Sequence, residues 1–177
     1  MDELFLLPHA PVAMPRAYWL DQPFLSSQLL IVTPSTVEWT RISTFMNTHD
    51  DAGFDMDILN KLYKDSATII PHRAYDLLTA EFRHAPDKHA SYLGSAEEKW
   101  DGRKALDEAK FVHFSDWPVK KPWAKDSIGL DEKKPDCVKK GEREDCTDRE
   151  IWLGLYSGYA TKRKVSRNDF LRYLVSG

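Results

Sequence analysis

Two hydrophobic patterns follow one another in the first part of the chain. Residues 28–32 form an apolar run ended by a Thr-Pro pair, which predicts a strand buried on both faces. Ser35 and Glu38 then have capping-box spacing, and an apolar stripe at helical spacing predicts a helix to about Asn47. A strand that passes directly into a helix is typical of α/β architecture.

The same patterns recur further along. They predict helices over 55–63 and 147–163, strands over 67–70 and 110–114, and a short final helix over 168–175. Three strands leave two open sheet edges, which natural proteins avoid. We therefore expect either that residues outside this chain complete the sheet or that it holds further strands.

Prolines dominate the first segment. Because proline cannot donate to a ladder and restricts the residue before it, residues 1–23 are predicted to be a loop, with at most a helical turn over 2–6. The region 76–82 is predicted as a helical turn. Residues 97–109 are predicted as an exposed helix or an ordered loop, because they are highly charged.

Composition restricts the class of protein. With 177 residues, 42% of them hydrophobic, the chain is long and apolar enough for an ordinary globular domain. The formal net charge of −3 argues against a nucleic-acid binder held by bulk charge. No window approaches the ~20 apolar residues of a membrane span, so none is predicted.

Two cysteines, Cys137 and Cys146, lie in one charged segment with Gly141 between them. Two thiolates are too few for a structural zinc site, which takes four ligands. A local disulfide and a pair of exposed free thiols both remain open from the sequence.

His113 is the first candidate for chemistry. It lies in an apolar strand just before a break, and open α/β sheets bind ligands at the carboxyl ends of their strands. The alternative is a buried histidine satisfied by a backbone carbonyl. Asp55 and Asp57 form a D-x-D pair, but they enter a helix instead of following a strand. We interpret Asp55 as an N-cap that can still face a site, and Asp57 as a complement to the helix dipole.

Other candidates have weaker patterns. Lys120, Lys121 and Lys125 flank Trp123, either as phosphate partners or as a solvated surface. A zinc site built from the three loop histidines matches none of the usual spacings; these are His72, His84 and His89. No Gly-rich phosphate loop and no G-x-S-x-G motif occurs.

Residues 110–123, K-F-V-H-F-S-D-W-P-V-K-K-P-W, resemble the closing motif of glycosyltransferase family 8, the family of glycogenin. That motif is a strand ending in V-H-F, then a loop, then K-P-W. The S-D-W-P version is similar to a fungal branch with glucose N-acetyltransferase-like proteins of the Golgi. Three further segments resemble the family or this branch in order: 24–35, 55–60 and 145–154. The resemblance covers about residues 1–160.

The resemblance implies a GT-A fold, with 1–135 as the C-terminal part of that domain and 136–177 as an extension carrying an amphipathic helix. It also implies retaining transfer from a nucleotide-sugar, such as a UDP-sugar, to a glycan or protein acceptor with Mn²⁺. The site residues it implies are His113 for metal, Lys121 for diphosphate, Asp55 for catalysis, and Ser26, Ser27 and Trp123 for substrate.

The chain departs from the family at two sugar-site positions, where Ser26 replaces an amide and Met56 replaces Gln. The family's D-x-D clamp and first strands correspond to sequence before Met1, so we expect an N-terminally incomplete fold with weak or no activity alone. The Golgi lumen is the implied compartment, where the two cysteines can bond. The alternatives are a non-catalytic remnant that binds a partner protein and a small zinc-binding module.

Overall fold

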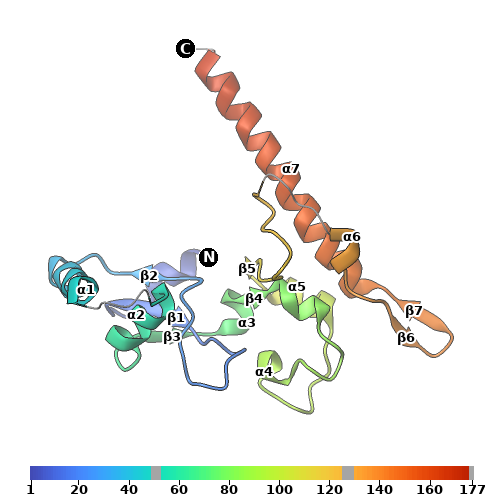
Figure 1. Cartoon of the computed structure of the whole chain (residues 1–177), viewed down its shortest axis with the longest axis horizontal. Helices are drawn as coiled ribbons and strands as arrows, with labels where there is room; N and C mark the ends of the chain where they lie inside the picture. Colours follow the sequence, from blue (N-terminus) through green and yellow to red (C-terminus); the bar gives the residue numbers. More distant parts are fainter. Residues whose placement is uncertain (49–52, 125–129, 176–177) are drawn as a thin grey trace. The chain divides into compact units, whose positions relative to one another are not determined.

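The computed structural model describes residues 1–48, 53–124 and 130–175, with residues 164–175 described as backbone alone. Its short helices and small sheets agree with the predicted α/β class (Figure 1). The chain divides into two compact units. The first unit comprises 1–77, 90–98 and 108–112, and the second comprises 78–89, 99–107 and the described residues from 113 onward. The predicted division at residue 135 stays a prediction.

A three-stranded mixed sheet organises the first unit (Figure 1). Its central strand is β1 (Val12–Pro15), which pairs antiparallel with β2 (Ile31–Val32) and parallel with β3 (Thr68–Ile70). All four β1 residues are buried. Ala13 pairs with Ile31 on one side and with Thr68 on the other, which fixes the register of the sheet.

Strand β1 corrects the prediction that residues 1–23 form a loop around a helical turn. The turn exists as η1 (Asp2–Leu6), but the prolines hid the strand. Pro15 is the last residue of β1, where its missing N–H costs little, and its carbonyl accepts the Ser26 N–H at 2.8 Å. The predicted strand over 28–32 is also corrected: it is short and lies at the sheet edge, with Val32 59% exposed.

Alternation along β1 builds two apolar clusters in the first unit. Val12 and Met14 face α1 (Thr36–Thr48) and α2 (Asp55–Tyr63), and pack with Tyr63 and Ile42. Ala13 points to the other cluster, formed with residues of η1, β3 and α3 (His72–Tyr75); its buried members are Leu4, Ile70 and Tyr75. A side-chain period of two explains this division between the two faces.

Both predicted helix starts exist, but one has a different cap. At α1 the Glu38 N–H donates to Ser35 Oγ at 3.4 Å, as the capping box predicts. At α2 the N-cap is Phe54, and its N–H donates to Asp57 at 3.0 Å. Asp55 is therefore the first helical residue instead of the cap. Its exposed carboxylate accepts the Met56 N–H at 2.8 Å.

The chain passes between the units five times: in β4 (Leu77–Leu78), after residues 89 and 98, in α5 (Gly102–Glu108) and in β5 (Val112–His113). The predicted turn over 76–82 corresponds to β4 and the 3-10 helix η2 (Thr79–Arg83). Helix α5 covers 102–108 of the segment 97–109 that was predicted as an exposed helix or an ordered loop, and its Gly102 and Ala105 are buried. The remaining short helices are α4 (Ala90–Leu93) in the first unit and α6 (Leu130–Lys133) in the second.

The long helix α7 (Thr147–Val175) packs on η2 in the second unit. Trp152 on α7 is fully buried, with its ring 4.6 Å from that of Tyr156 and 6.0 Å from the Arg83 guanidinium. One continuous helix replaces the two predicted over 147–163 and 168–175. None of the described helices combines the length and apolar character that a membrane crossing requires.

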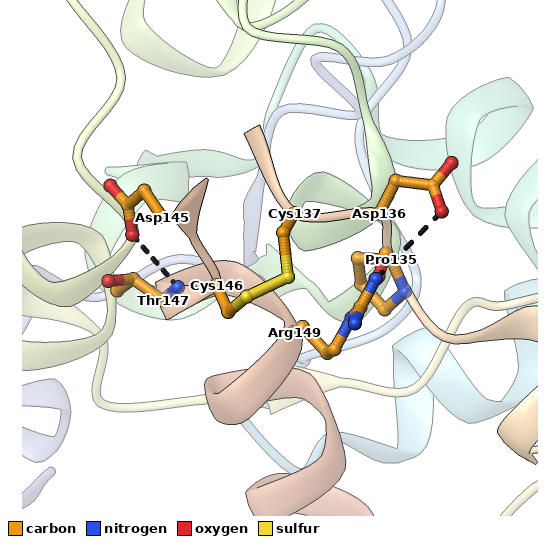
Figure 2. Close-up of a disulfide and its surroundings, with 7 residues drawn as sticks. All are labelled: Pro135, Asp136, Cys137, Asp145, Cys146, Thr147 and Arg149. Atoms are coloured by element: carbon orange, nitrogen blue, oxygen red, sulfur yellow. Dashed lines mark hydrogen bonds and ion pairs between the residues drawn. A yellow bond between two sulfur atoms is a disulfide. The ribbon is translucent and has the colours of Figure 1, made fainter. Parts of the chain in front are cut away.

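A disulfide-closed hairpin precedes α7. Strands β6 (Val138–Lys140) and β7 (Arg143–Asp145) pair antiparallel around Gly141, whose φ of +65° suits a tight turn. Cys137 and Cys146 are bonded, with their Cα atoms 4.4 Å apart (Figure 2). The structure thus selects the disulfide from the two alternatives that the sequence left open.

Candidate functional site

In the first unit, a buried segment presents Ser26. The Ser26 side chain is fully buried, its N–H donates to Pro15, and its Oγ accepts the Gln28 N–H at 3.2 Å. Asn60 of α2 holds the residue before Ser26, Leu25, by two hydrogen bonds of 2.8 Å. The Leu25 N–H donates to Asn60 Oδ1, and Asn60 Nδ2 donates to the Leu25 carbonyl. The chain around Ser26 is therefore fixed by backbone and side-chain contacts together.

Asp76 is a candidate that sequence reasoning missed. It follows α3, its side chain is fully buried, and among the described residues neither carboxylate oxygen has a hydrogen-bond partner of normal geometry. Burial raises the pKa of Asp76 to about 7, and interaction with the Ser26 hydroxyl offsets part of the rise. The one sequence signal was an acidic residue directly before the apolar pair Leu77-Leu78.

A carboxyl group with this pKa has useful chemistry. Near neutral pH it exists in both protonation states, so it can accept or donate a hydrogen bond to a ligand hydroxyl. Asp76 and Ser26 form a polar pair, and both side chains are fully buried. Such pairs with strongly shifted pKa values occur preferentially at functional sites.

The other predicted residues of the first unit are more exposed. Ser27 is half-buried, and Asp55 is exposed at the start of α2 with its carboxylate bonded to its own helix. Asn60 connects that helix to the Ser26 segment. The structure therefore links Asp55 to Ser26 through α2, while the direct neighbour of Ser26 is Asp76.

In the second unit, β5 ends at His113 and the following loop returns Lys121 to it. The Lys121 Nζ lies 3.4 Å from His113 Nε2 and also donates to the Phe114 carbonyl. Burial lowers the pKa of His113 to about 4, and the Lys121 charge lowers it further. Burial also lowers the pKa of Lys121, against the influence of Asp116. His113 is therefore a neutral imidazole, the form that binds metal ions.

Trp123 places an aromatic ring beside the His113–Lys121 pair. Its ring meets Phe114 edge-on at 6.2 Å and lies 5.7 Å from the ring of Tyr159 on α7. The Lys121 Nζ is 5.9 Å from the Trp123 ring, and 45% of the Trp123 surface remains exposed. An aromatic face beside a cation can stack on a ligand ring while the cation binds an anion.

A buried polar network holds the loop between His113 and Lys121. Asp116 accepts hydrogen bonds from Thr79 and, at 2.9 Å, from Tyr156, and one of its oxygens lies 3.5 Å from Arg83. The Ser115 N–H donates to Thr79 at 3.0 Å. Burial raises the pKa of Tyr156, and the Asp116 charge raises it further, so the phenol stays a donor. This network fixes the loop on η2 and α7.

His113 fits a metal only as a single ligand. It belongs to no group of three clustered metal-ligating side chains in the described part of the chain. Of the three loop histidines, His72 belongs to the first unit, where its ring lies 2.7 Å from the Tyr92 carbonyl, and His84 and His89 belong to the second. Lys125 lies outside the described residues.

The chain is similar to fungal proteins named glucose N-acetyltransferase 1. It is 53% identical to that of Gibberella zeae over 169 residues, which are 93% of this chain and 37% of the relative. For Aspergillus fumigatus the identity is 43% over 181 residues, 93% of this chain and 47% of the relative. For Saccharomyces cerevisiae the identity is 24% over 179 residues, which cover 79% of this chain and 36% of the relative.

The chain therefore spans less than half the length of these relatives. No family model matches it, and no solved structure does. The similarity supports the fungal branch identified from the sequence motifs.

Proposed function

We propose that this chain is part of a glycosyltransferase with a GT-A fold, which transfers an N-acetylglucosaminyl or hexosyl group from a UDP-sugar to a glycan or protein acceptor. The observation that carries the proposal is the His113–Lys121 pair at the end of β5. Support also comes from the 53% identity to a protein named glucose N-acetyltransferase 1, which extends over nearly the whole chain.

The second unit would bind the leaving group. A departing nucleoside diphosphate gains negative charge, and catalysis requires that this charge be stabilised. Lys121 provides an ammonium group for it, and the adjacent Trp123 ring provides a surface for stacking. Mn²⁺ would supply further charge stabilisation, and His113 would be one of its ligands through a neutral imidazole.

We propose sugar contacts for three residues of the first unit. Ser26 and Ser27 offer hydroxyl groups, and Asp76 adds a carboxyl that can hydrogen-bond to Ser26 or to a sugar hydroxyl. Transfer with retention needs a carboxylate near the anomeric carbon to stabilise the developing positive charge. Asp55 is the residue we assign to that role, because it is exposed and placed at a helix start.

We propose that the 177-residue chain alone has weak or no turnover. Divalent metals in transferase sites need several oxygen or nitrogen ligands, and His113 supplies one. The described residues add no second and third ligand to it. Metal affinity at His113 is therefore expected to be low in this chain.

We propose the Golgi lumen as the compartment. The Cys137–Cys146 disulfide supports this, because disulfides persist in oxidising compartments and are rare in the cytosol.

Calorimetric titration of the chain with UDP, with and without Mn²⁺, tests the proposed function. Because metal affinity at His113 is low, we expect Mn²⁺ to strengthen UDP binding only at high Mn²⁺ concentration, and we expect His113→Ala to remove this Mn²⁺-dependent part. His9→Ala is the matched control, because His9 is exposed in the first unit. Folded protein without any UDP binding would contradict the proposal.

A non-catalytic role in binding a partner protein is the second candidate. Helix α1 favours it, because none of its residues is buried and it exposes Val37, Trp39 and Met46. Exposed apolar groups of this kind favour association. If this role is correct, Trp39→Ser weakens association while UDP binding is absent in every variant.

A further inference from the structure

Glu81, His84 and His89 form a compact side-chain cluster in the second unit. The Glu81 Oε2 lies 3.0 Å from His89 Nδ1 and 3.4 Å from His84 Nδ1. One ligand atom from each of the three side chains lies within 4.8 Å of the other two. The cluster comes from one short segment, η2 and the loop that follows it.

Burial makes this cluster unusual for a surface ion pair. Glu81 is 3% exposed and His89 is 2% exposed, whereas His84 is half-exposed at the mouth of the cluster. A buried carboxylate needs compensating charge, and the side chains that pair with Glu81 are these two imidazoles. The neighbouring cation, Arg83, interacts with the carboxylate of Asp116 at 3.5 Å. A divalent cation bound between the three side chains would supply such charge.

Neighbouring aromatic residues hold the cluster in place. Trp100 stacks on the His89 ring, with centroids 4.1 Å apart and planes 10° from parallel, and also meets Phe82 edge-on at 5.6 Å. The Trp100 Nε1 donates to Asp148 on α7 at 2.9 Å. The His89 ring is therefore fixed before any ligand arrives, which lowers the entropic cost of binding one.

We propose that Glu81, His84 and His89 form a zinc-binding site. Two imidazole nitrogens and one carboxylate oxygen are a common zinc ligand set, with the fourth position left to water. Ligands on a tetrahedron with bonds of about 2.0–2.1 Å lie roughly 3.3 Å apart, close to the separations of the two histidines from Glu81. The exposed side of His84 gives the ion and its water access from solvent.

The site shares no residue with the proposed transferase site. The second ligand-type cluster of the described chain, Cys137, Glu144 and Cys146, cannot compete as a thiolate site, because its cysteines are bonded to each other. The zinc site therefore makes a prediction that is independent of UDP binding and of His113.

The test is calorimetric titration of the chelator-treated 177-residue chain with ZnCl₂. We expect one zinc ion per chain, and at least tenfold weaker binding in His84→Ala. His84 is half-exposed, so the variant should fold, and its circular dichroism melt verifies this. His9→Ala and His113→Ala are matched controls, and both should bind zinc like the parent chain.

Cobalt substitution gives a second readout. Co²⁺ in the site should show the visible absorption of a four- or five-coordinate ion, which Glu81→Gln and His84→Ala abolish and His9→Ala leaves unchanged. Three results overturn the proposal: no zinc binding by the folded chain, equal affinity in His84→Ala, or loss of binding in His9→Ala. UDP binding lost in His113→Ala with zinc binding intact would separate the two sites.

Discussion

At the residue scale, Asn60 decides whether the Ser26 segment keeps its position. Its side-chain amide bonds to both the N–H and the carbonyl of Leu25, and Asn60, Leu25 and Ser26 are all buried. Asn60→Ala leaves a buried N–H and a buried carbonyl without partners, so we expect it to cost roughly 2–4 kcal/mol of unfolding free energy. Urea unfolding measures this. Asn47→Ala on the exposed face of α1 is the control and should change little.

Asp76 should make the stability of the first unit depend on pH. Its pKa is about 7 in the folded chain against an ordinary value of 3.8, so the folded state holds a proton that the unfolded state releases. The stabilising contribution is complete below pH 3.8 and is lost as the pH rises to about 7. Each pKa unit corresponds to about 1.4 kcal/mol.

Asp76→Asn removes this ionisation. We expect the stability of the variant, relative to that of the parent chain, to be higher at pH 8 than at pH 4.5. Urea unfolding at both pH values measures this. Asp65→Asn, at an exposed position of the same unit, should show no such gain. Equal pH dependence in the parent and Asp76→Asn would show that Asp76 is ionised in the folded state at low pH.

Sequence reasoning predicted the candidate site only in part. His113 and Lys121 lie in one continuous motif, and the structure brings them together as the motif implies. Asp76 was missed because it acts on a residue far along the chain, Ser26. Asn60 ends the segment 55–60 that resembles the family, but its partner, Leu25, was not predicted. Partners of this kind are created by folding and leave no local pattern.

At the element scale, the Cys137–Cys146 disulfide should stabilise the β6–β7 hairpin before α7. It closes a loop with a sequence separation of 9. Loop-closure entropy for this length predicts about 2.5 kcal/mol. Reduction should therefore lower the melting temperature of the parent chain, while the double variant Cys137→Ser, Cys146→Ser melts equally with and without reductant. An unchanged melting temperature on reduction would contradict this role.

The docking of α7 onto η2 should depend on Trp152. This side chain is fully buried against Tyr156 and Arg83. Trp152→Ala is expected to cost about 3–5 kcal/mol in urea unfolding. Trp117→Ala provides the matched control, because Trp117 is 89% exposed and its removal should stay within about 0.5 kcal/mol. Comparable losses in the two variants would show that α7 does not rely on this contact.

The elements were predictable where a local signal was strong. Capping residues and apolar stripes marked α1, α2 and the start of α7, and a β-branched run marked β3. Strand β1 was missed because its neighbouring prolines indicate a loop, although Pro15 occupies only its last position. The hairpin β6–β7 was missed because its residues are charged and it depends on the disulfide.

At the scale of the whole molecule, the two units carry different candidate chemistry. The first unit contains Ser26 and Asp76, which we propose for a sugar, and the second contains His113 and Lys121, which we propose for a metal and a diphosphate. Neither set constitutes a transferase by itself. Binding of UDP is therefore a more direct test than turnover, because it probes the proposed diphosphate contact of Lys121 without the sugar.

The most direct measurement compares UDP and uridine binding, in the presence of Mn²⁺, by the parent chain, Lys121→Met and Lys120→Met. Lys121 contacts His113 and Phe114, whereas Lys120 is its exposed neighbour, so both variants lose one charge but only one loses the proposed contact. We predict that Lys121→Met weakens UDP binding by roughly tenfold or more and leaves uridine binding unchanged, while Lys120→Met binds like the parent chain. Equal UDP affinity in all three proteins would contradict the assignment of this pair to a diphosphate.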